Sequence, residues 1–155
     1  MRPAGPITAV FLAAAAATAQ PSYTPAQAEA LVRKAVAYAK AHGIERLCRE
    51  TNEPGGAFHV GSGGAGEMYL FVYDPQGTCR AIGFNPKALV GKNRIDLKDP
   101  DGRMYLREMI EVARTRGRGW VDYRYPDPVT GRVLPKTSYV EWHEGLLFGC
   151  GVYRR

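Results

Sequence analysis

The most constraining feature of this sequence is a six-residue run, MYLFVY, at Met68–Tyr73. Aromatic and β-branched residues in such a run predict a β-strand, and both of its alternating sets of side chains are apolar. A strand that is apolar on both faces is a central strand in a sheet that is covered on both sides. The turn residues of Asp74–Gly77 then predict a hairpin that returns through a second strand at Thr78–Phe84.

Helices are predicted on either side of this hairpin in the chain. Thr24-Pro25-Ala26-Gln27 forms a capping box, and the apolar stripe after it indicates a long helix that ends at Gly43. A second, short helix is expected from Ile44 to Thr51. Asp99-Pro100-Asp101-Gly102 predicts the start of another helix, with Asp99 or Asp101 as its cap and a buried stripe that begins at Leu106.

Three further strands are predicted towards the C-terminus, at Gly119–Tyr125, Lys136–His143 and Leu146–Tyr153. The turns between them, Asp127–Gly131 and Glu144-Gly145, are short enough for antiparallel hairpins. Five strands in hairpins, with helices gathered at the faces, indicate an α+β domain built around one antiparallel sheet.

The N-terminal segment has the three-part layout of a secretory signal peptide. Arg2 precedes an apolar run from Ile7 to Ala17, and Ala17-Thr18-Ala19 is a small-x-small cleavage site. The run is shorter than the roughly 20 residues that span a bilayer. We therefore expect residues 1–19 to be a signal peptide and residues 20–155 to be a single periplasmic or secreted domain without a membrane span. An alanine-rich helix that packs on the domain or stays as an anchor is the alternative.

Charge and cysteine usage argue against several function classes. The formal net charge of +6 comes from scattered Lys and Arg residues, and no nucleic-acid motif accompanies it. The three histidines are isolated, and none of the three cysteines stands in a Cys-x-x-Cys pair. We therefore expect no nucleic acid partner, no metal and no cofactor.

Seven short motifs, taken in their order, resemble the single Cache domain family. Each motif is weak by itself, but the ordered set is specific and extends from about Ala28 to Tyr153. The motifs are Tyr69–Asp74 (YLFVYD), Asn85-Pro86, Val90–Asn93 (VGKN), Asp99–Gly102 (DPDG), Gly119–Tyr123 (GWVDY), Pro135–Val140 (PKTSYV) and Gly149–Tyr153 (GCGVY).

The resemblance implies a PAS-like antiparallel sheet of five strands, with a long N-terminal helix, a helical crossover and a small-ligand pocket. It places Met68–Tyr73 between Thr78–Phe84 and Leu146–Tyr153. Such domains usually form the extracytoplasmic part of chemoreceptors and histidine kinases, and they bind small organic acids such as acetate, lactate or pyruvate, or amino acids. This chain resembles the stand-alone exported version. We therefore expect a non-catalytic, sensor-type binding domain, with a membrane receptor or kinase as a candidate partner.

The same arrangement bears on the cysteines, because it puts one strand between Cys79 and Cys150. Two strand spacings amount to about 9–10 Å, which exceeds the roughly 7 Å between Cα atoms that a disulfide allows. A bridge from Cys48 to one of the others and three buried thiols both stay open, and the thiols are favoured.

A pocket for a small carboxylate needs a cation or converging hydrogen-bond donors between dry walls. Lys136 enters its strand beside three hydroxyl side chains, and the resemblance places this segment along the ligand pocket. We expect Lys136 to supply the charge, and Tyr139 and Tyr69 to donate hydrogen bonds. An edge lysine that reaches solvent is the alternative.

Aromatic rings are the candidates for the walls of this pocket: Phe71, Trp120 and Tyr123. Ordinary core packing is the alternative for each of them. Strand parity adds a constraint, since Trp120 and Tyr123 face opposite sides of a regular strand. Without a bulge, only one of the two belongs to the pocket.

Two glycine-containing segments admit a functional interpretation. Gly61–Gly66 (GSGGAG) lacks the Lys-Ser/Thr ending of a phosphate-binding loop, so a hairpin connection is predicted. Gly91-Lys92-Asn93 could present backbone N–H groups to an anion, although a turn is favoured. No motif places a nucleophile beside a base, so we expect no enzyme. The competing function is an interaction module that docks on a membrane receptor or enzyme.

Overall fold

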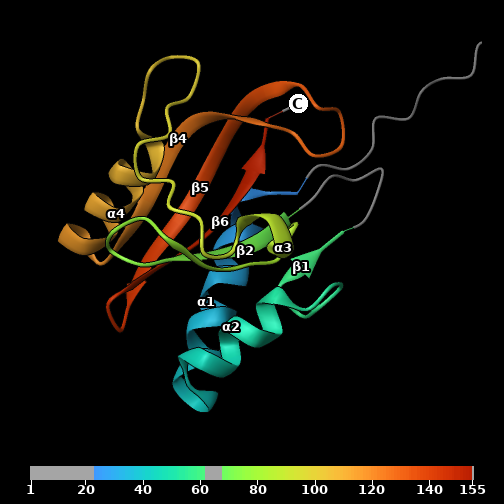
Figure 1. The fold of residues 1–155 in the computed structure, drawn as a ribbon, viewed down its shortest axis with the longest axis vertical. Coiled ribbons are helices and arrows are strands. Elements are labelled where there is room, and N and C mark those ends of the chain that lie inside the picture. Colours follow the sequence, from blue (N-terminus) through green and yellow to red (C-terminus); the bar gives the residue numbers. More distant parts are fainter. Residues whose placement is uncertain (1–22, 62–67, 155) are drawn as a thin grey trace, which may run out of the picture.

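Helices pack on both faces of one antiparallel sheet (Figure 1). The computed structural model describes residues 23–61 and 68–154. The predicted signal peptide and residues 62–66 of the glycine-rich loop lie outside the described residues. The elements in chain order are α1 (Pro25–His42), α2 (Ile44–Asn52), β1 (His59–Val60), β2 (Met68–Tyr73), β3 (Cys79–Ile82), α3 (Pro86–Leu89), α4 (Tyr105–Arg116), β4 (Arg118–Pro126), β5 (Val133–His143) and β6 (Leu146–Tyr153).

The sheet has the order β1-β2-β6-β5-β4, and β3 pairs with β2 along the same edge as β1. Every pairing is antiparallel. The predicted central position of β2 is confirmed, because Val72 pairs with Ala81 of β3 on one side and with Phe148 of β6 on the other. The five predicted strands are all present. The added strand β1 is only two residues long, too short for a periodic signal.

Helix α1 covers one face of the sheet. The Thr24 hydroxyl accepts a hydrogen bond from the Gln27 backbone N–H, and the Gln27 side chain accepts one from the Thr24 N–H at 2.8 Å. The predicted capping box is therefore confirmed. The apolar stripe of the helix is buried against the sheet and consists of Ala28, Leu31, Val32, Ala35, Val36 and Ala39.

Strand β2 is apolar on both faces because it separates two hydrophobic cores. Leu70 and Val72 belong to the core beneath α1, whereas Tyr69, Phe71 and Tyr73 belong to the core beneath α4. All six residues of the strand are buried. The second core carries the aromatic residues, and it is on this face that the candidate site lies.

Helix α4 begins beyond the DPDG turn and not at it, which corrects the prediction that Asp99 or Asp101 caps it. The Asp99 carboxylate instead accepts the backbone N–H groups of Asp101 and Arg103 at 3.0 and 2.9 Å, and of Arg124 in β4 at 3.1 Å. Burial raises the pKa of this carboxyl, but the three N–H donors outweigh burial and the net pKa is lowered. Asp99 thus closes its own turn and ties the segment 91–104 to β4.

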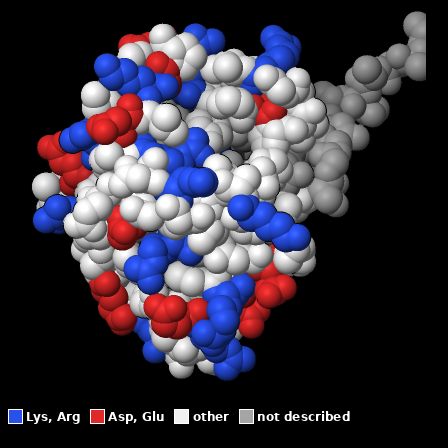
Figure 2. All heavy atoms as spheres, in the orientation of Figure 1, with Lys and Arg blue, Asp and Glu red and all other residues white. Residues whose placement is uncertain are grey.

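All three cysteines are buried and unpaired, so the favoured alternative of free thiols holds. Strand β2 lies between Cys79 on β3 and Cys150 on β6. Burial raises the pKa of Cys79 to about 11 and that of Cys150 to about 12. On the outer surface, basic and acidic side chains are interspersed over the face shown in Figure 2.

Candidate functional site

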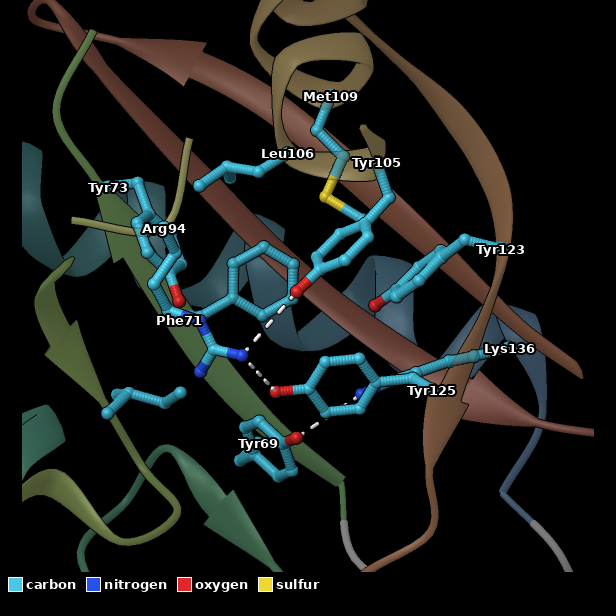
Figure 3. A pocket seen from close by; sticks show the side chains of 11 residues that line it. Tyr69, Phe71, Tyr73, Arg94, Tyr105, Leu106, Met109, Tyr123, Tyr125 and Lys136 are labelled. Atoms are coloured by element: carbon cyan, nitrogen blue, oxygen red, sulfur yellow. Dashed lines mark hydrogen bonds between the residues drawn. The ribbon is translucent and has the colours of Figure 1, made fainter. Parts of the chain in front are cut away.

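A small cavity lies between the sheet and α4, with walls from β2, β3, β4, β5, α4 and the segment 91–104 (Figure 3). Its volume is about 30 Å³, which is room for two or three water molecules at roughly 10–15 Å³ each. Five of the lining residues are tyrosines and two are cations. The lining residues are Tyr69, Phe71, Tyr73, Ile82, Arg94, Tyr105, Leu106, Met109, Tyr123, Tyr125 and Lys136.

Lys136 projects from β5 into an aromatic cage and is only 3% exposed. Its Nζ donates to the Tyr69 hydroxyl at 3.3 Å. The same atom lies 4.8, 5.0 and 4.7 Å from the ring centroids of Tyr69, Tyr125 and Tyr153, within the range of cation–π attraction. Among the residues that the structure describes, no carboxylate forms an ion pair with this ammonium. A buried charge of this kind calls for an anionic partner.

Two glycines of β6 make room for the side chains that cross the strand on this face. An added Cβ atom at Gly151 would lie 2.7 Å from Lys136 Cε, and one at Gly149 would enter the Phe71 ring. Real Cβ atoms essentially never approach other heavy atoms this closely. The GCG motif therefore leaves β6 without side chains at positions 149 and 151 on the cavity side, while Cys150 between the glycines packs in the core beneath α1.

Arg94 supplies the second cation, from the irregular segment that follows α3. Its Nη2 donates to the hydroxyls of Tyr125 at 2.9 Å and Tyr105 at 3.4 Å, as the dashed lines in Figure 3 show. Burial lowers the pKa of the guanidinium, but the hydroxyls of Tyr125, Tyr73 and Tyr105 outweigh it and the net pKa is raised. Arg94 is therefore charged at every physiological pH, and within residues 23–61 and 68–154 it has no carboxylate partner.

Four of the tyrosines in the cavity keep their hydroxyl protons. Burial is the largest cause that raises the pKa of Tyr69, Tyr73, Tyr105 and Tyr123 above that of a free phenol. Because the oxygens of Tyr105 and Tyr125 accept from Arg94, their hydroxyl hydrogens point elsewhere and can be donated to a ligand. The Tyr123 hydroxyl pairs with the Ser138 hydroxyl at 3.0 Å, and its ring stacks on Tyr105.

Four of the six predicted site residues line the cavity: Tyr69, Phe71, Tyr123 and Lys136. Trp120 and Tyr139 do not, because they are a cross-strand pair on the opposite face of β4 and β5. Tyr139 is buried in the core beneath α1, its hydroxyl donates to Glu141 at 3.2 Å, and Trp120 lies over it with 41% exposure. The regular β4–β5 register has no bulge to bring them to the cavity side.

Sequence reasoning missed seven lining residues. For Tyr125 the signal was present, since it shares the strand face of Tyr123 two positions away. Arg94 follows the predicted turn at Gly91–Asn93, but an irregular segment has no period from which to read where a side chain points. The remaining five residues were themselves predicted with structural roles only: Tyr73, Ile82, Tyr105, Leu106 and Met109.

The chemistry that this arrangement offers is anion binding. Two cations and several hydroxyl donors converge on a volume walled by aromatic and aliphatic groups, where low polarity strengthens electrostatic attraction. No group of three or more His, Cys, Asp or Glu side chains in the described ranges could hold a metal ion. In the same ranges, no helix has the length and apolar character needed to cross a membrane.

Two curated proteins match part of this chain. The sensor histidine kinase MctS of Rhizobium johnstonii is 36% identical over 89 residues, which is 55% of this chain and 18% of the kinase. The methyl-accepting chemotaxis protein McpP of Pseudomonas putida is 38% identical over 71 residues, or 44% of this chain and 13% of that protein. The chain therefore spans less than a fifth of the length of these relatives.

Solved structures of extracytoplasmic sensor domains share the fold. A periplasmic sensor domain of a chemotaxis protein is 25% identical with a TM-score of 0.61, over 84% of this chain and 90% of that one. A Cache chemosensory domain solved for its carboxylic acid recognition is also 25% identical, with a TM-score of 0.61, over 84% and 88% of the two chains. Cache domains are sensory, ligand-binding modules of receptors and kinases. The family model of single Cache domain 2 matches residues 7–153, and the chain belongs to this family.

Proposed function

We propose that the cavity binds a short monocarboxylic acid, such as acetate, lactate or pyruvate, and that the protein is a non-catalytic sensor domain for it. The observation that carries the proposal is the pair of cations, Lys136 and Arg94, that meet in one cavity without a described carboxylate partner. A ligand carboxylate would accept from both cations and from the hydroxyls of Tyr105 and Tyr125. Phe71 and the aliphatic lining residues would enclose its short alkyl group.

The charges in the cavity favour an organic acid over an amino acid. The ammonium group of an amino acid would face Lys136 and Arg94 at short range, and the described lining contains no acidic side chain to hold it. Like charges that close together in a low-polarity site repel strongly. The small volume, about 30 Å³, adds a size limit, because only short acids fit after small adjustments of the lining side chains.

Two comparisons support this assignment. The structurally similar Cache chemosensory domain was solved for its recognition of a carboxylic acid, and the two curated relatives are a sensor kinase and a chemotaxis protein. Together with the predicted signal peptide, these relatives support a periplasmic or secreted location, where the domain would meet its ligand outside the cytoplasm. A membrane receptor or kinase is the partner we propose.

Isothermal titration calorimetry with acetate, propionate, lactate, pyruvate and alanine tests the proposal on the protein and two variants. Lys136→Met keeps most of the side-chain length but removes the charge, and Lys87→Met, at an exposed lysine in α3, is the matched control. Loss of a charge-assisted hydrogen bond of about 1.5–3 kcal/mol lowers the affinity about 10- to 100-fold in Lys136→Met, while Lys87→Met binds as the parent does. An unchanged affinity in Lys136→Met, or no acid bound by the parent protein, overturns the proposal.

Thermal melting without ligand provides a second measurement. A buried ammonium without a counter-ion costs free energy in the empty domain, so Lys136→Met melts at a temperature equal to or above that of the parent. Added acid raises the melting temperature of the parent by mass action but not that of the variant. A large drop in the melting temperature of the empty variant would assign Lys136 a structural role instead.

A further inference from the structure

Strand β4 forms a free edge of the sheet, because in the described part of the chain it pairs with β5 alone (Figure 1). Residues 118–126 all pair with β5 in one unbroken register. Natural proteins protect such an edge with bulges, prolines, very short strands or charges that repel a partner. In β4 the proline, Pro126, stands at the very end, so the stretch before it is open to another strand.

Hydrogen bonds identify the backbone groups of β4 that point away from the sheet. In an antiparallel strand the N–H and C=O of one residue point to the same side, and the side alternates along the strand. The Gly117 carbonyl accepts from the Trp142 N–H of β5 at 2.8 Å. The Arg124 N–H instead donates out of the sheet, to the Asp99 carboxylate at 3.1 Å. The even-numbered residues of β4 therefore present their backbone groups at the edge.

Three even-numbered residues of β4 precede Arg124: Arg118, Trp120 and Asp122. Within residues 23–61 and 68–154, no hydrogen-bond partner reaches their backbone groups. Their side chains share one face of the strand and are exposed. On this face α1 packs over β5 and β6, and Trp120 remains 41% exposed beside it.

The side chains at this edge are complementary to themselves. When two copies of β4 pair antiparallel about a twofold axis at Trp120, each Arg118 lies opposite Asp122 of the other copy, and the two Trp120 residues face each other. Opposite charges and aromatic rings in directly opposed positions stabilise a strand pair. Because all of these residues have outward backbone groups, each opposed pair can exchange two N–H···O bonds.

Neighbouring registers are less favourable. A shift by one residue opposes outward groups to groups that already pair with β5. A shift by two residues in one direction opposes Arg118 to Arg124, which places like charges together and requires the Arg124 N–H that Asp99 holds. The same shift in the other direction leaves Asp122 beyond the end of the partner strand. The edge therefore favours the register centred on Trp120.

We propose that two copies of this chain dimerise through β4, which joins their sheets across a twofold axis at Trp120. The inference goes beyond the proposed function and does not depend on the ligand. Asp122 already lies 3.4 Å from Arg154, but both side chains are more than half exposed, and an exposed ion pair contributes little. A dimer held mainly by one strand pair is weak and reversible, with a dissociation constant in the micromolar range or above.

Sedimentation velocity over micromolar to millimolar concentrations compares the parent with four variants: Arg118→Glu, Asp122→Arg, the double variant and Lys87→Glu. Each single change on β4 opposes like charges in both symmetry-related pairs, so the dissociation constant rises about 10- to 100-fold. Lys87→Glu makes the same change of charge as Arg118→Glu, at an exposed position of α3. This control associates as the parent does.

Restoring complementarity provides the sharpest measurement. The double variant opposes acid to base again and recovers the association of the parent. In an equimolar mixture of Arg118→Glu and Asp122→Arg, every opposed pair of the mixed dimer joins an acid to a base. The mixture therefore dimerises at concentrations at which each variant alone is monomeric. Circular dichroism checks that all variants are folded.

A parent that stays monomeric at millimolar concentration overturns the inference. A dimer that all variants form equally well places the contact elsewhere and also overturns it, as does a mixture that fails to associate. Acid titration tests the proposed function separately, because Arg118, Asp122 and Lys87 do not line the cavity. Dimerisation without acid binding would overturn the proposed function alone.

Discussion

Replacing Gly151 by alanine tests whether the bare side of β6 is what admits Lys136 to its cage. The added Cβ atom would lie 2.7 Å from Lys136 Cε and 3.0 Å from the Thr137 carbonyl oxygen, with the Ser138 hydroxyl oxygen nearer still. Thr137 belongs to β5, which is paired on both sides and cannot retreat. The side chains of Lys136 and Ser138 must therefore move away from β6.

The size of the effect follows from this crowding. Forcing an extra methyl group into a packed interior costs about 1–3 kcal/mol, and for a domain of this size each kcal/mol lowers the melting temperature by roughly 4 °C. We expect Gly151→Ala to melt about 4–12 °C below the parent. The ammonium of Lys136 also leaves its position. Acetate affinity should therefore fall about 10- to 100-fold, because one charge-assisted hydrogen bond to the ligand is lost.

Differential scanning calorimetry and acid titration measure both effects, and Gly119→Ala provides the control. Gly119 lies on the same face at the start of β4, where an added Cβ atom meets only the Val112 side chain, at 2.5 Å. Val112 is half-buried and can shift, so this variant loses less stability and binds acetate normally. If Gly151→Ala melts within about 1 °C of the parent and binds acetate equally well, β6 does not position Lys136 and the reasoning is refuted.

Three further predictions concern other parts of the fold. Asp99→Ala leaves three backbone N–H groups without their acceptor and lowers the free energy of unfolding by about 2 kcal/mol at neutral pH. The folded state lowers the pKa of this carboxyl. The stabilisation by Asp99 is therefore fully present above the unfolded-state pKa and is lost as the pH falls through the folded-state pKa. Urea titrations of the parent and the variant should converge in acid. Cys79 and Cys150, with pKa values of about 11 and 12, should resist iodoacetamide at pH 8 until urea unfolds the domain. Mass spectrometry measures the labelling, and rapid labelling of the native protein would contradict the burial of these thiols. Trp120→Ala and Tyr139→Phe leave acetate affinity within about twofold of the parent in calorimetry, and a larger loss would place these residues in the binding site.

The parts of the fold that could be predicted are those in which local chemistry and tertiary packing agree. The two-sided apolar pattern of β2 indicated its central place, and the capping box at Thr24 marked the start of α1 correctly. The DPDG turn shows the opposite case, because an aspartate before a helical stripe resembles a cap. Its carboxylate instead accepts backbone N–H groups from its own turn and from β4. The contact with Arg124 depends on tertiary structure, which the local sequence does not reveal.

The candidate site could be predicted only where strand parity applies. Parity separated Trp120 from Tyr123, but it could not say which face carries the cavity, and Trp120 lies on the opposite face. Tyr139 was predicted as a donor because it follows Lys136 closely, although residues three positions apart on a strand face opposite sides. The direction of Arg94 depends on how an irregular segment folds over β4 and α4, which no local pattern encodes.

The two cations of the cavity are held by parts of the chain with different tolerance for change. Lys136 sits on a strand that is paired on both sides, whereas Arg94 sits in a connecting segment, where its own N–H donates to the carbonyl of Gly77. Connecting segments accept substitutions and insertions at less cost to stability than interior strands do. One of the two groups proposed to attract the acid is therefore open to change at little cost to the fold. Exchange of the segment 91–104 between members of this family should change acid affinity through the residue at position 94, while the sheet and its thermal stability persist.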